Sequence, residues 1–260
     1  MAKARRRKTR LDLLCVDRGL SESRQRAQAL IMAGQVLVDG VRVTKSGAAV
    51  DADARLELVQ PDHPYVSRGG LKLAAALEAF ALDVEGDFAL DVGASTGGFT
   101  DCLLQRGARH VLAVDVGYGQ LAWRLRQDGR VTSVERCNAR HLTAEALRGA
   151  LPAEIPGLWP PTLCTIDVSF ISLTLVLPAV EGIVARGSRV VALIKPQFEA
   201  ARAEVGKGGV VRDPEARARA IARVLDWARG RGHDVEGTIP SPIAGPKGNV
   251  EELALLRTPV

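Results

Sequence analysis

The sequence predicts an α/β protein in which a small N-terminal α+β domain precedes a doubly wound, mostly parallel sheet. Two observations lead to this prediction. From residue 88 onward, strand-like runs alternate with helical patterns, which is typical of a parallel sheet covered by helices. The charge is also unevenly distributed, since residues 1–60 hold 12 Lys/Arg and 7 Asp/Glu, whereas residues 61–260 hold 23 of each. We therefore expect a basic module followed by a neutral body.

The composition excludes several other classes of protein. With 47% hydrophobic and 25% charged residues among 260, the chain is neither disordered nor fibrous. The four cysteines form no CxxC pair and no histidines follow at zinc spacing, so we expect reduced thiols, no metal site and a cytoplasmic location. No signal peptide is visible, and the longest uncharged apolar stretch, residues 168–180, is too short to span a bilayer.

The first 60 residues divide into two helices and a small sheet. An amphipathic helix begins near residue 10, and a second helix is capped by Ser21 or Ser23 and ended by Gly34. The stretch QVLVDGVRV then reads as two short alternating runs around Asp-Gly, which is a strong hairpin signal. A further strand is expected at 55–59.

This arrangement resembles the S4 RNA-binding domain, in which a helix pair presents arginines before a hairpin that opens with VLVDG. The resemblance implies that structured RNA binds to Arg10, Arg24 and Arg26, with Lys45 contributing from the strand side. Basic modules favour polyanions because phosphate contacts release counterions. The alternative is that a solvated basic start only aids solubility. We assign residues 1–60 to this domain and its basic arm, 61–66 to a linker and 67–260 to a second domain.

The second domain is expected to contain seven strands, of which the last is antiparallel. Five strand-like runs alternate with helical patterns, and two more close the chain. The expected strands are 88–92, 110–115, 131–135, 162–167, 189–194, 233–240 and 249–257.

A glycine-rich turn, in ALDVGASTGGFT, lies between the first of these strands and a helix. Gly93, Gly97 and Gly98 permit tight turning and close approach of the backbone to a ligand. The spacing differs from the GxGxxG of dinucleotide binders, and no lysine follows as in a phosphate-cradling loop. Asp115 ends the next strand, where an acid accepts hydrogen bonds from ribose hydroxyls. The pattern favours S-adenosylmethionine, which has a ribose and no pyrophosphate; NAD is the alternative that the spacing disfavours.

Charged residues follow two strands of the predicted core. Asp167 and Lys195 end the fourth and fifth strands, and ligands gather at the carboxyl ends of a doubly wound sheet. Lys72, on a helix before the first strand, and Glu251, at the start of the last strand, are further candidates, with Glu252 as the alternative acid. A neighbouring positive charge and partial burial lower the pKa of a lysine, while neighbouring carboxylates hold it in place. Such a cluster can assist deprotonation of an alcohol.

The set resembles the FtsJ-like 2′-O-methyltransferases, whose Lys-Asp-Lys-Glu tetrad matches Lys72, Asp167, Lys195 and Glu251 in order. It is still more similar to the TlyA, or hemolysin A, family of ribosomal RNA methyltransferases. The segments that carry the resemblance include VSRGGLKL, LDVGASTGGFTDCLL, IDVSFISL, IKPQFE and SPIAGPKGNVE.

The resemblance implies an S-adenosylmethionine-dependent enzyme that methylates the 2′-hydroxyl of a cytidine, with ribosomal RNA or a ribosomal subunit as its partner. We expect the large-subunit (23S) site, because the chain has the extended basic start of members that also modify 16S RNA but ends soon after the last strand. Tyr118 and Gln120 either wall the nucleoside or are packing residues. Besides Tyr118, the implied cofactor residues are Gly93, Ala94, Ser95, Gly97, Gly98, Phe99, Asp115, Asn138 and Asp167, the last shared with the tetrad.

Two functions of other classes stay open at the level of sequence. One is a non-catalytic RNA-binding ribosome-assembly factor with a vestigial methyltransferase fold. The other is a membrane-active hemolysin, although the sequence has neither a spanning segment nor a strongly amphipathic apolar helix.

Overall fold

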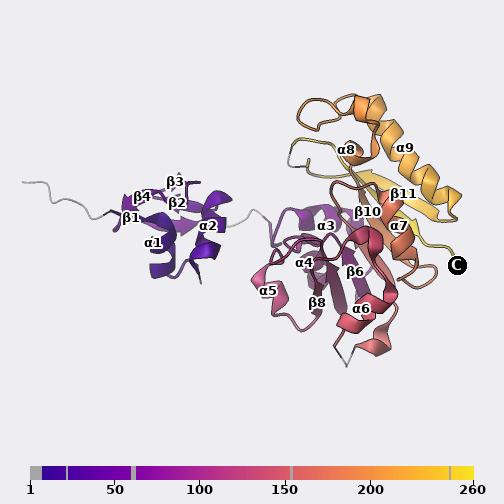
Figure 1. Ribbon diagram of the computed structural model, residues 1–260, viewed down its shortest axis with the longest axis horizontal. Coiled ribbons are helices and arrows are strands. Elements are labelled where there is room, and N and C mark those ends of the chain that lie inside the picture. The colour runs from indigo at the N-terminus through magenta and orange to yellow at the C-terminus, as the bar shows by residue number, and fades with distance from the viewer. Residues whose placement is uncertain (1–7, 22, 60–62, 153–154, 246) are drawn as a thin grey trace, which may run out of the picture. The chain divides into compact units, whose positions relative to one another are not determined.

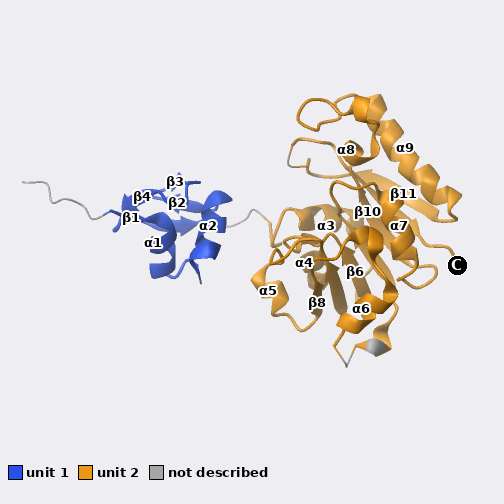
Figure 2. Ribbon diagram, in the orientation of Figure 1, with its two compact units in different colours: residues 1–62 blue, residues 63–260 orange. Residues whose placement is uncertain are grey.

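The computed structural model describes residues 8–21, 23–59, 63–152, 155–245 and 247–260. The chain divides into two compact units, which comprise residues 1–62 (unit 1) and 63–260 (unit 2), as Figure 2 shows. Most of the predicted basic arm, residues 1–7, and part of the predicted linker, residues 60–62, lie outside the described residues.

Unit 1 contains the two predicted helices and the predicted hairpin. Asp39 and Gly40 both have positive φ, 50° and 79°, as the two central residues of a tight hairpin turn require. The sequence does not predict the additional β1–β4 pair, because neither three-residue segment has an alternating pattern. The elements are β1 (Lys8–Arg10), α1 (Leu11–Asp17), α2 (Arg24–Met32), β2 (Val36–Val38), β3 (Val41–Arg42), β4 (Ala49–Asp51) and β5 (Leu56–Leu58).

Unit 2 is built on a seven-stranded sheet, which confirms the predicted architecture. The strand order is β11-β12-β10-β9-β6-β7-β8, and β12 is antiparallel to both of its neighbours. The strands are β6 (Phe88–Val92), β7 (His110–Val114), β8 (Val131–Val134), β9 (Leu163–Ile166), β10 (Arg189–Ile194), β11 (Asp234–Pro240) and β12 (Glu252–Arg257).

Helices cover both faces of this sheet (Figure 1). One core packs α3, α4 and α5 against the sheet, and the other packs α6, α7 and α9 against the opposite face. Along β6, Phe88 and Leu90 belong to the second core and Ala89 to the first, because side chains alternate along a strand. The helices are α3 (Gly69–Ala79), α4 (Gly98–Gln105), α5 (Trp123–Arg126), α6 (Ala144–Ala150), α7 (Leu173–Glu181), α8 (Pro196–Glu199) and α9 (Pro214–Gly230), with short 3₁₀ turns at Ala139–His141, Pro156–Leu158 and Arg202–Glu204.

The topology fixes where a ligand would bind. From β6 the chain winds outward through β7 to β8, and then returns to the other side of β6 with β9. The switch point therefore lies between β6 and β9, and ligands of doubly wound sheets bind there, beyond the carboxyl ends of the strands. Gly93 follows β6 with φ of +86°, and a Cβ atom at this position would lie 2.6 Å from the carbonyl oxygen of Asp167. Only glycine lets the two strand ends meet so closely.

Candidate active site

Two hollows open at the switch point and share a wall. We call the larger one the wide cleft; it runs from Asp115 past Asn138 to Phe198. We call the smaller one the narrow pocket; it is lined by the start of α3, the glycine-rich loop and the turn before β12. The residues that line both hollows are Gly93, Ser95, Asp167 and Ser169.

The narrow pocket brings together the four charged residues that the sequence singles out. Nζ of Lys72 lies 2.5 Å from Oε2 of Glu251, and Nζ of Lys195 lies 2.5 Å from Oδ1 of Asp167. The Lys195 ammonium also donates a hydrogen bond to Oγ of Ser169 at 3.0 Å. Of the two acids considered at the start of the last strand, Glu251 is the one that faces the pocket. Each lysine is therefore held by a carboxylate, as charges removed from water require.

Close packing of backbone places Lys72 beside the glycine-rich loop. A Cβ atom on Gly98, the first residue of α4, would lie 2.3 Å from Oγ of Ser67 and 2.9 Å from the amide nitrogen of Gly70. The starts of α3 and α4 therefore touch, which leaves no room for a side chain between them. One turn further along α3, Lys72 reaches the pocket.

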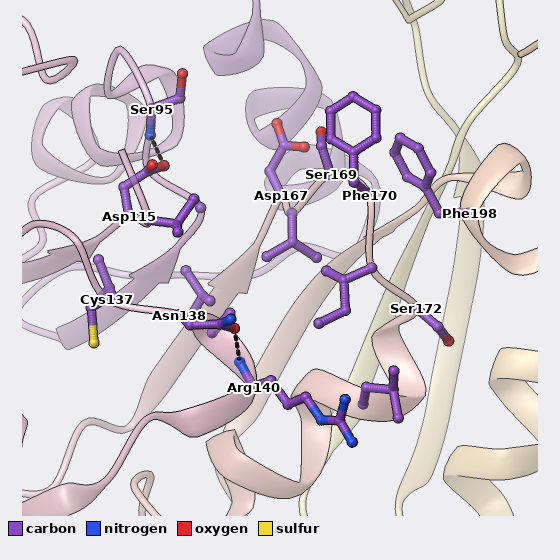
Figure 3. Close-up of a pocket in the computed structure, with 18 of the residues that line it drawn as sticks. Ser95, Asp115, Cys137, Asn138, Arg140, Asp167, Ser169, Phe170, Ser172 and Phe198 are labelled. Carbon is purple, nitrogen blue, oxygen red and sulfur yellow. Dashed lines mark hydrogen bonds between the residues drawn. The ribbon is translucent and has the colours of Figure 1, made fainter. Parts of the chain in front are cut away.

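The cleft end of β7 presents an oriented carboxylate. Asp115 accepts hydrogen bonds from the backbone amides of Ser95 at 2.8 Å and Gly117 at 2.7 Å, the first of which is drawn in Figure 3. Ser95 has a positive φ of 49°, which is uncommon for a residue with a side chain and turns its amide toward Asp115. The carboxylate is thus fixed at the edge of the wide cleft, where it can accept hydrogen bonds from a ribose.

The neighbouring wall of the wide cleft suits an adenine ring. Val116 is 70% exposed although it is apolar, and Cys137 lines the same wall. Asn138 uses its side-chain oxygen to accept from the amide of Arg140 at 3.0 Å (Figure 3), which leaves its NH₂ group available to a ligand. An acid for the ribose, an apolar wall and a glycine-rich loop without a lysine fit S-adenosylmethionine.

Two of the predicted cofactor residues are not brought to either hollow. Gly97 lies behind the loop, where its φ of +96° and the nearby Leu125 side chain, 2.3 Å from a Cβ built there, give it a packing role. Tyr118 is 70% exposed and lies beneath the guanidinium of Arg136, which is 4.2 Å from the ring centre. The structure therefore places Tyr118 outside both hollows, whereas Gln120, the residue considered together with it, lines the wide cleft. The other predicted cofactor residues line one or both hollows: Gly93, Ala94, Ser95, Gly98, Phe99, Asp115, Asn138 and Asp167.

Sequence reasoning missed an aromatic pair at the mouth of the cleft. Phe170 is 89% exposed, has a positive φ of 64°, and its ring centre lies 5.1 Å from that of Phe198. Figure 3 shows the two rings next to each other. A bulky residue in this backbone conformation is a true outlier and points to a functional constraint. The only signal in the sequence is the position of Phe170 three residues after Asp167, in the loop that leaves a core strand.

Sequence reasoning also left a buried acid beneath the glycine-rich loop without a role. Asp91, in β6, is inaccessible to solvent and accepts hydrogen bonds from the hydroxyls of Thr100 at 2.6 Å and Thr165 at 2.9 Å. Burial raises the pKa of Asp91 to about 6, since the two hydroxyls compensate only part of the lost hydration and the charge of Asp167 adds to the shift.

In unit 1, the structure groups some of the predicted RNA-binding residues. Arg10 and Arg24 both form ion pairs with the buried Asp12. Lys45 and Arg26 are exposed. Arg26 lies two positions after Arg24 on α2, and residues at this spacing do not share a helix face.

Comparison with known proteins gives a consistent result. Residues 65–258 match the FtsJ-like methyltransferase family, and residues 9–56 match the S4 domain. The chain is 49% identical over 253 residues to the 16S/23S rRNA (cytidine-2′-O)-methyltransferase TlyA of Mycobacterium tuberculosis, covering 97% of this chain and 91% of the relative. It is 43% identical over 249 residues to hemolysin A of Brachyspira hyodysenteriae, covering 94% and 98%.

A solved structure named "Putative hemolysin from Streptococcus thermophilus" superposes with a TM-score of 0.73 at 45% identity, covering 97% of this chain and 89% of that one. The helices that the structure describes include none long and apolar enough to cross a membrane.

Proposed function

The chain belongs to the FtsJ-like methyltransferase family, and on this premise we propose that it transfers a methyl group from S-adenosylmethionine to the ribose 2′-hydroxyl of a cytidine in ribosomal RNA, with 23S RNA as the expected substrate. One observation carries the proposal: Lys72, Asp167, Lys195 and Glu251 surround one pocket that shares a wall with a cleft suited to adenosine. The named activity of the M. tuberculosis relative supports the choice of cytidine.

The wide cleft would hold the cofactor. Asp115 would accept hydrogen bonds from the ribose hydroxyls, and Val116 and Asn138 would hold the adenine. The backbone of Gly93 would lie against the methionine part, since a side chain is excluded there. When bound, S-adenosylmethionine supplies a methyl group that its positively charged sulfur activates. Asp167 and Ser169, on the shared wall, lie where the two hollows meet, so the methyl group would face the narrow pocket.

The narrow pocket would hold the target ribose. Nζ of Lys195, fixed by Asp167 and Ser169, would orient the 2′-oxygen and take up its proton during attack while passing one of its own protons to the Asp167 carboxylate, so that the ammonium keeps its charge. Lys72, held by Glu251 on the other wall, would stabilise negative charge that develops on the oxygen. Orientation and charge stabilisation are sufficient for methyl transfer because the positively charged sulfur of S-adenosylmethionine is already a good leaving group.

The aromatic pair at the cleft mouth would bind the base. An enzyme that acts on a ribose inside folded RNA gains access when the nucleotide leaves its stack, and exposed aromatic rings replace the lost stacking. Phe170 is exposed in this way and lies next to Phe198. Stacking on such a ring contributes about 1–3 kcal/mol per base.

Unit 1 would bind RNA outside the catalytic pocket. We assign residues 1–60 to an S4 RNA-binding domain, 61–66 to a linker and 67–260 to the methyltransferase domain. Arg10, Arg24, Arg26 and Lys45 would contact phosphates, as the match to the S4 domain supports.

Mapping the methylated nucleotide tests the proposal. The protein is incubated with methyl-labelled S-adenosylmethionine and, separately, with small and large ribosomal subunits, and the labelled ribose is located by primer extension at limiting nucleotide concentration. We expect label at a cytidine 2′-oxygen of the large subunit. Binding of S-adenosylmethionine and of RNA without any transfer would favour the non-catalytic assembly factor. Transfer to a base instead of a ribose would contradict the reaction.

A further inference from the structure

A buried carboxylate lies at the centre of the RNA-binding face predicted for unit 1. The side chain of Asp12, in the first turn of α1, is inaccessible to solvent. It accepts hydrogen bonds from Arg10 at 3.0 and 2.9 Å, from Nε of Arg24 at 3.0 Å and from the amide of Gln28 at 2.9 Å. The hydrogen bonds from Arg10 are the main reason that the pKa of Asp12 is held well below its usual range. The carboxylate is therefore ionised and fully engaged.

The contacts leave most of each guanidinium free. Arg10 uses two of its five N–H donors on Asp12 and Arg24 uses one, while the two side chains stay 47% and 51% exposed. Two long cations that would otherwise sample many rotamers are thus held at one place with outward-facing donors. Fixing them before RNA arrives lowers the entropy cost of binding.

Asp12 and Arg10 also hold the loop that carries Lys45. The backbone amide of Asp12 donates to the carbonyl of Ser46 at 3.0 Å. A Cβ atom on Gly47 would lie 3.3 Å from the Arg10 guanidinium, so the loop packs directly against that side chain. Residues from β1, α2 and the loop before β4 therefore converge around Asp12.

We propose that Asp12 is a positioning residue for RNA binding: it fixes Arg10 and Arg24 in the geometry that engages two neighbouring phosphates. The inference rests on the proposed RNA-binding role of unit 1 and gives a role in RNA binding to a buried acidic residue beneath the basic surface. The competing interpretation is that Asp12 serves only to join α1 to α2, with no effect on RNA.

Whether one substitution weakens or tightens RNA binding distinguishes positioning by Asp12 from a general effect of net charge. Asp12→Asn removes a negative charge, so an argument from net charge alone predicts tighter binding to a polyanion. Positioning predicts weaker binding, because the two guanidiniums lose their common anchor. Asp17→Asn is the matched control, since Asp17 lies on the same helix but is exposed and the change in charge is the same.

The experiment measures binding of the full-length protein to an unmodified 23S RNA transcript by filter binding, from 50 to 300 mM KCl. We expect Asp12→Asn to bind about 5- to 20-fold more weakly than wild type at 150 mM KCl. The slope of log K against log [KCl] should decrease in magnitude by about 1, which corresponds to the loss of one phosphate contact. Asp17→Asn should bind at least as tightly as wild type with an unchanged slope. Equal or tighter binding by Asp12→Asn would overturn the inference. No salt-dependent binding by the wild type would instead overturn the proposed function.

A second measurement does not depend on the folding of an Asp12 variant. Arg10→Ala and Arg24→Ala, both at exposed side chains, are combined in a double-mutant cycle against the same transcript. If Asp12 couples the two arginines, their losses in affinity are non-additive by at least about 2-fold. Strictly additive losses would show that the arginines act as independent charges and would overturn the inference even if Asp12→Asn cannot be purified.

Discussion

The two lysine–carboxylate pairs of the narrow pocket have the same chemistry and the same separation, 2.5 Å, but different surroundings. In the Lys72–Glu251 pair the side chains are 9% and 1% exposed, and the partners are 179 positions apart in the chain. In the Lys195–Asp167 pair they are 11% and 22% exposed, and Asp167 also lines the wide cleft. We call these the closed pair and the open pair.

The difference shows that the position of each pair, and not its residue types, determines whether it contributes mainly to catalysis or also to stability. The closed pair joins the first helix of unit 2 to the turn just before its last strand, and both side chains are buried, so breaking the pair leaves an uncompensated buried charge. The open pair lies at the switch point between the proposed cofactor and the target ribose, with Ser169 as a third partner. We therefore expect the open pair to govern the reaction and the closed pair to govern stability as well as activity.

The largest expected effect is on catalysis by the open pair. Lys195→Ala should reduce kcat by about 10³-fold, within the range for a proton-transfer group, while the thermal transition and the affinity for S-adenosylmethionine change little. Transfer of labelled methyl to large subunits, differential scanning fluorimetry and calorimetry measure the three quantities. Lys207→Ala, at an exposed lysine, is the control and should keep full activity. Near-normal transfer by Lys195→Ala would remove this lysine from the mechanism.

The open pair was also the easiest part of the site to predict from sequence. A buried strand must end in a turn, and all parallel strands of a doubly wound sheet deliver their carboxyl ends to one edge. Asp167 and Lys195 follow adjacent strands, so their meeting follows from topology once the strands are recognised. The closed pair needed the resemblance, because nothing local to Lys72 distinguishes a helix residue facing the pocket from one facing water.

Where the structure differs from the sequence prediction, the causes are equally specific. Tyr118 is a candidate for the cofactor wall because it closely follows Asp115 in the chain, with packing as the alternative. The structure places its ring beneath Arg136, since sequence distance does not give side-chain direction in a loop. Phe170 was missed because a single exposed aromatic leaves no periodic signal, and its positive φ is a product of tertiary structure. The sequence does not predict the β1–β4 pair because a three-residue strand is too short to show an alternating pattern and forms only when its partner strand is present.

The second prediction concerns stability and the closed pair. Glu251→Gln should lower the free energy of unfolding by about 3–5 kcal/mol, because the buried Lys72 loses its counter-charge. Asp167→Asn, the matched change in the open pair, should cost about 1 kcal/mol or less, since the Asp167 side chain is 22% exposed and Lys195 keeps its hydrogen bond to Ser169. Urea unfolding followed by tryptophan fluorescence measures both, as all three tryptophans, Trp123, Trp159 and Trp227, lie in unit 2. Equal losses in the two variants would remove the distinction between the pairs.

The smallest expected effect is on the pH dependence of stability and comes from Asp91. This buried carboxylate feels the charge of Asp167 in the open pair, and its pKa of about 6 lies above the ordinary value of 3.8. A raised pKa means that the folded state binds the proton more tightly than the unfolded state, so the stabilisation is complete below about pH 4 and is lost as the pH rises through 6. The change across this window is at most about 3 kcal/mol. Burial also raises the pKa of Glu199, which contributes in the same direction.

Asp91→Asn isolates the contribution of Asp91, because the amide cannot ionise but keeps both contacts: its oxygen can accept from one threonine hydroxyl and its NH₂ group can donate to the other. The free energy of unfolding of wild type minus that of the variant should fall between pH 4 and 6 and stay level above pH 7, as tryptophan-monitored urea unfolding would measure. In the Asp167→Asn background the fall should shift to lower pH, because the charge of Asp167 contributes to the raised pKa. A difference that does not vary with pH would show that the pKa of Asp91 is not raised by burial and by the charge of Asp167, and Asp91 would then not distinguish the surroundings of the open pair from those of the closed pair.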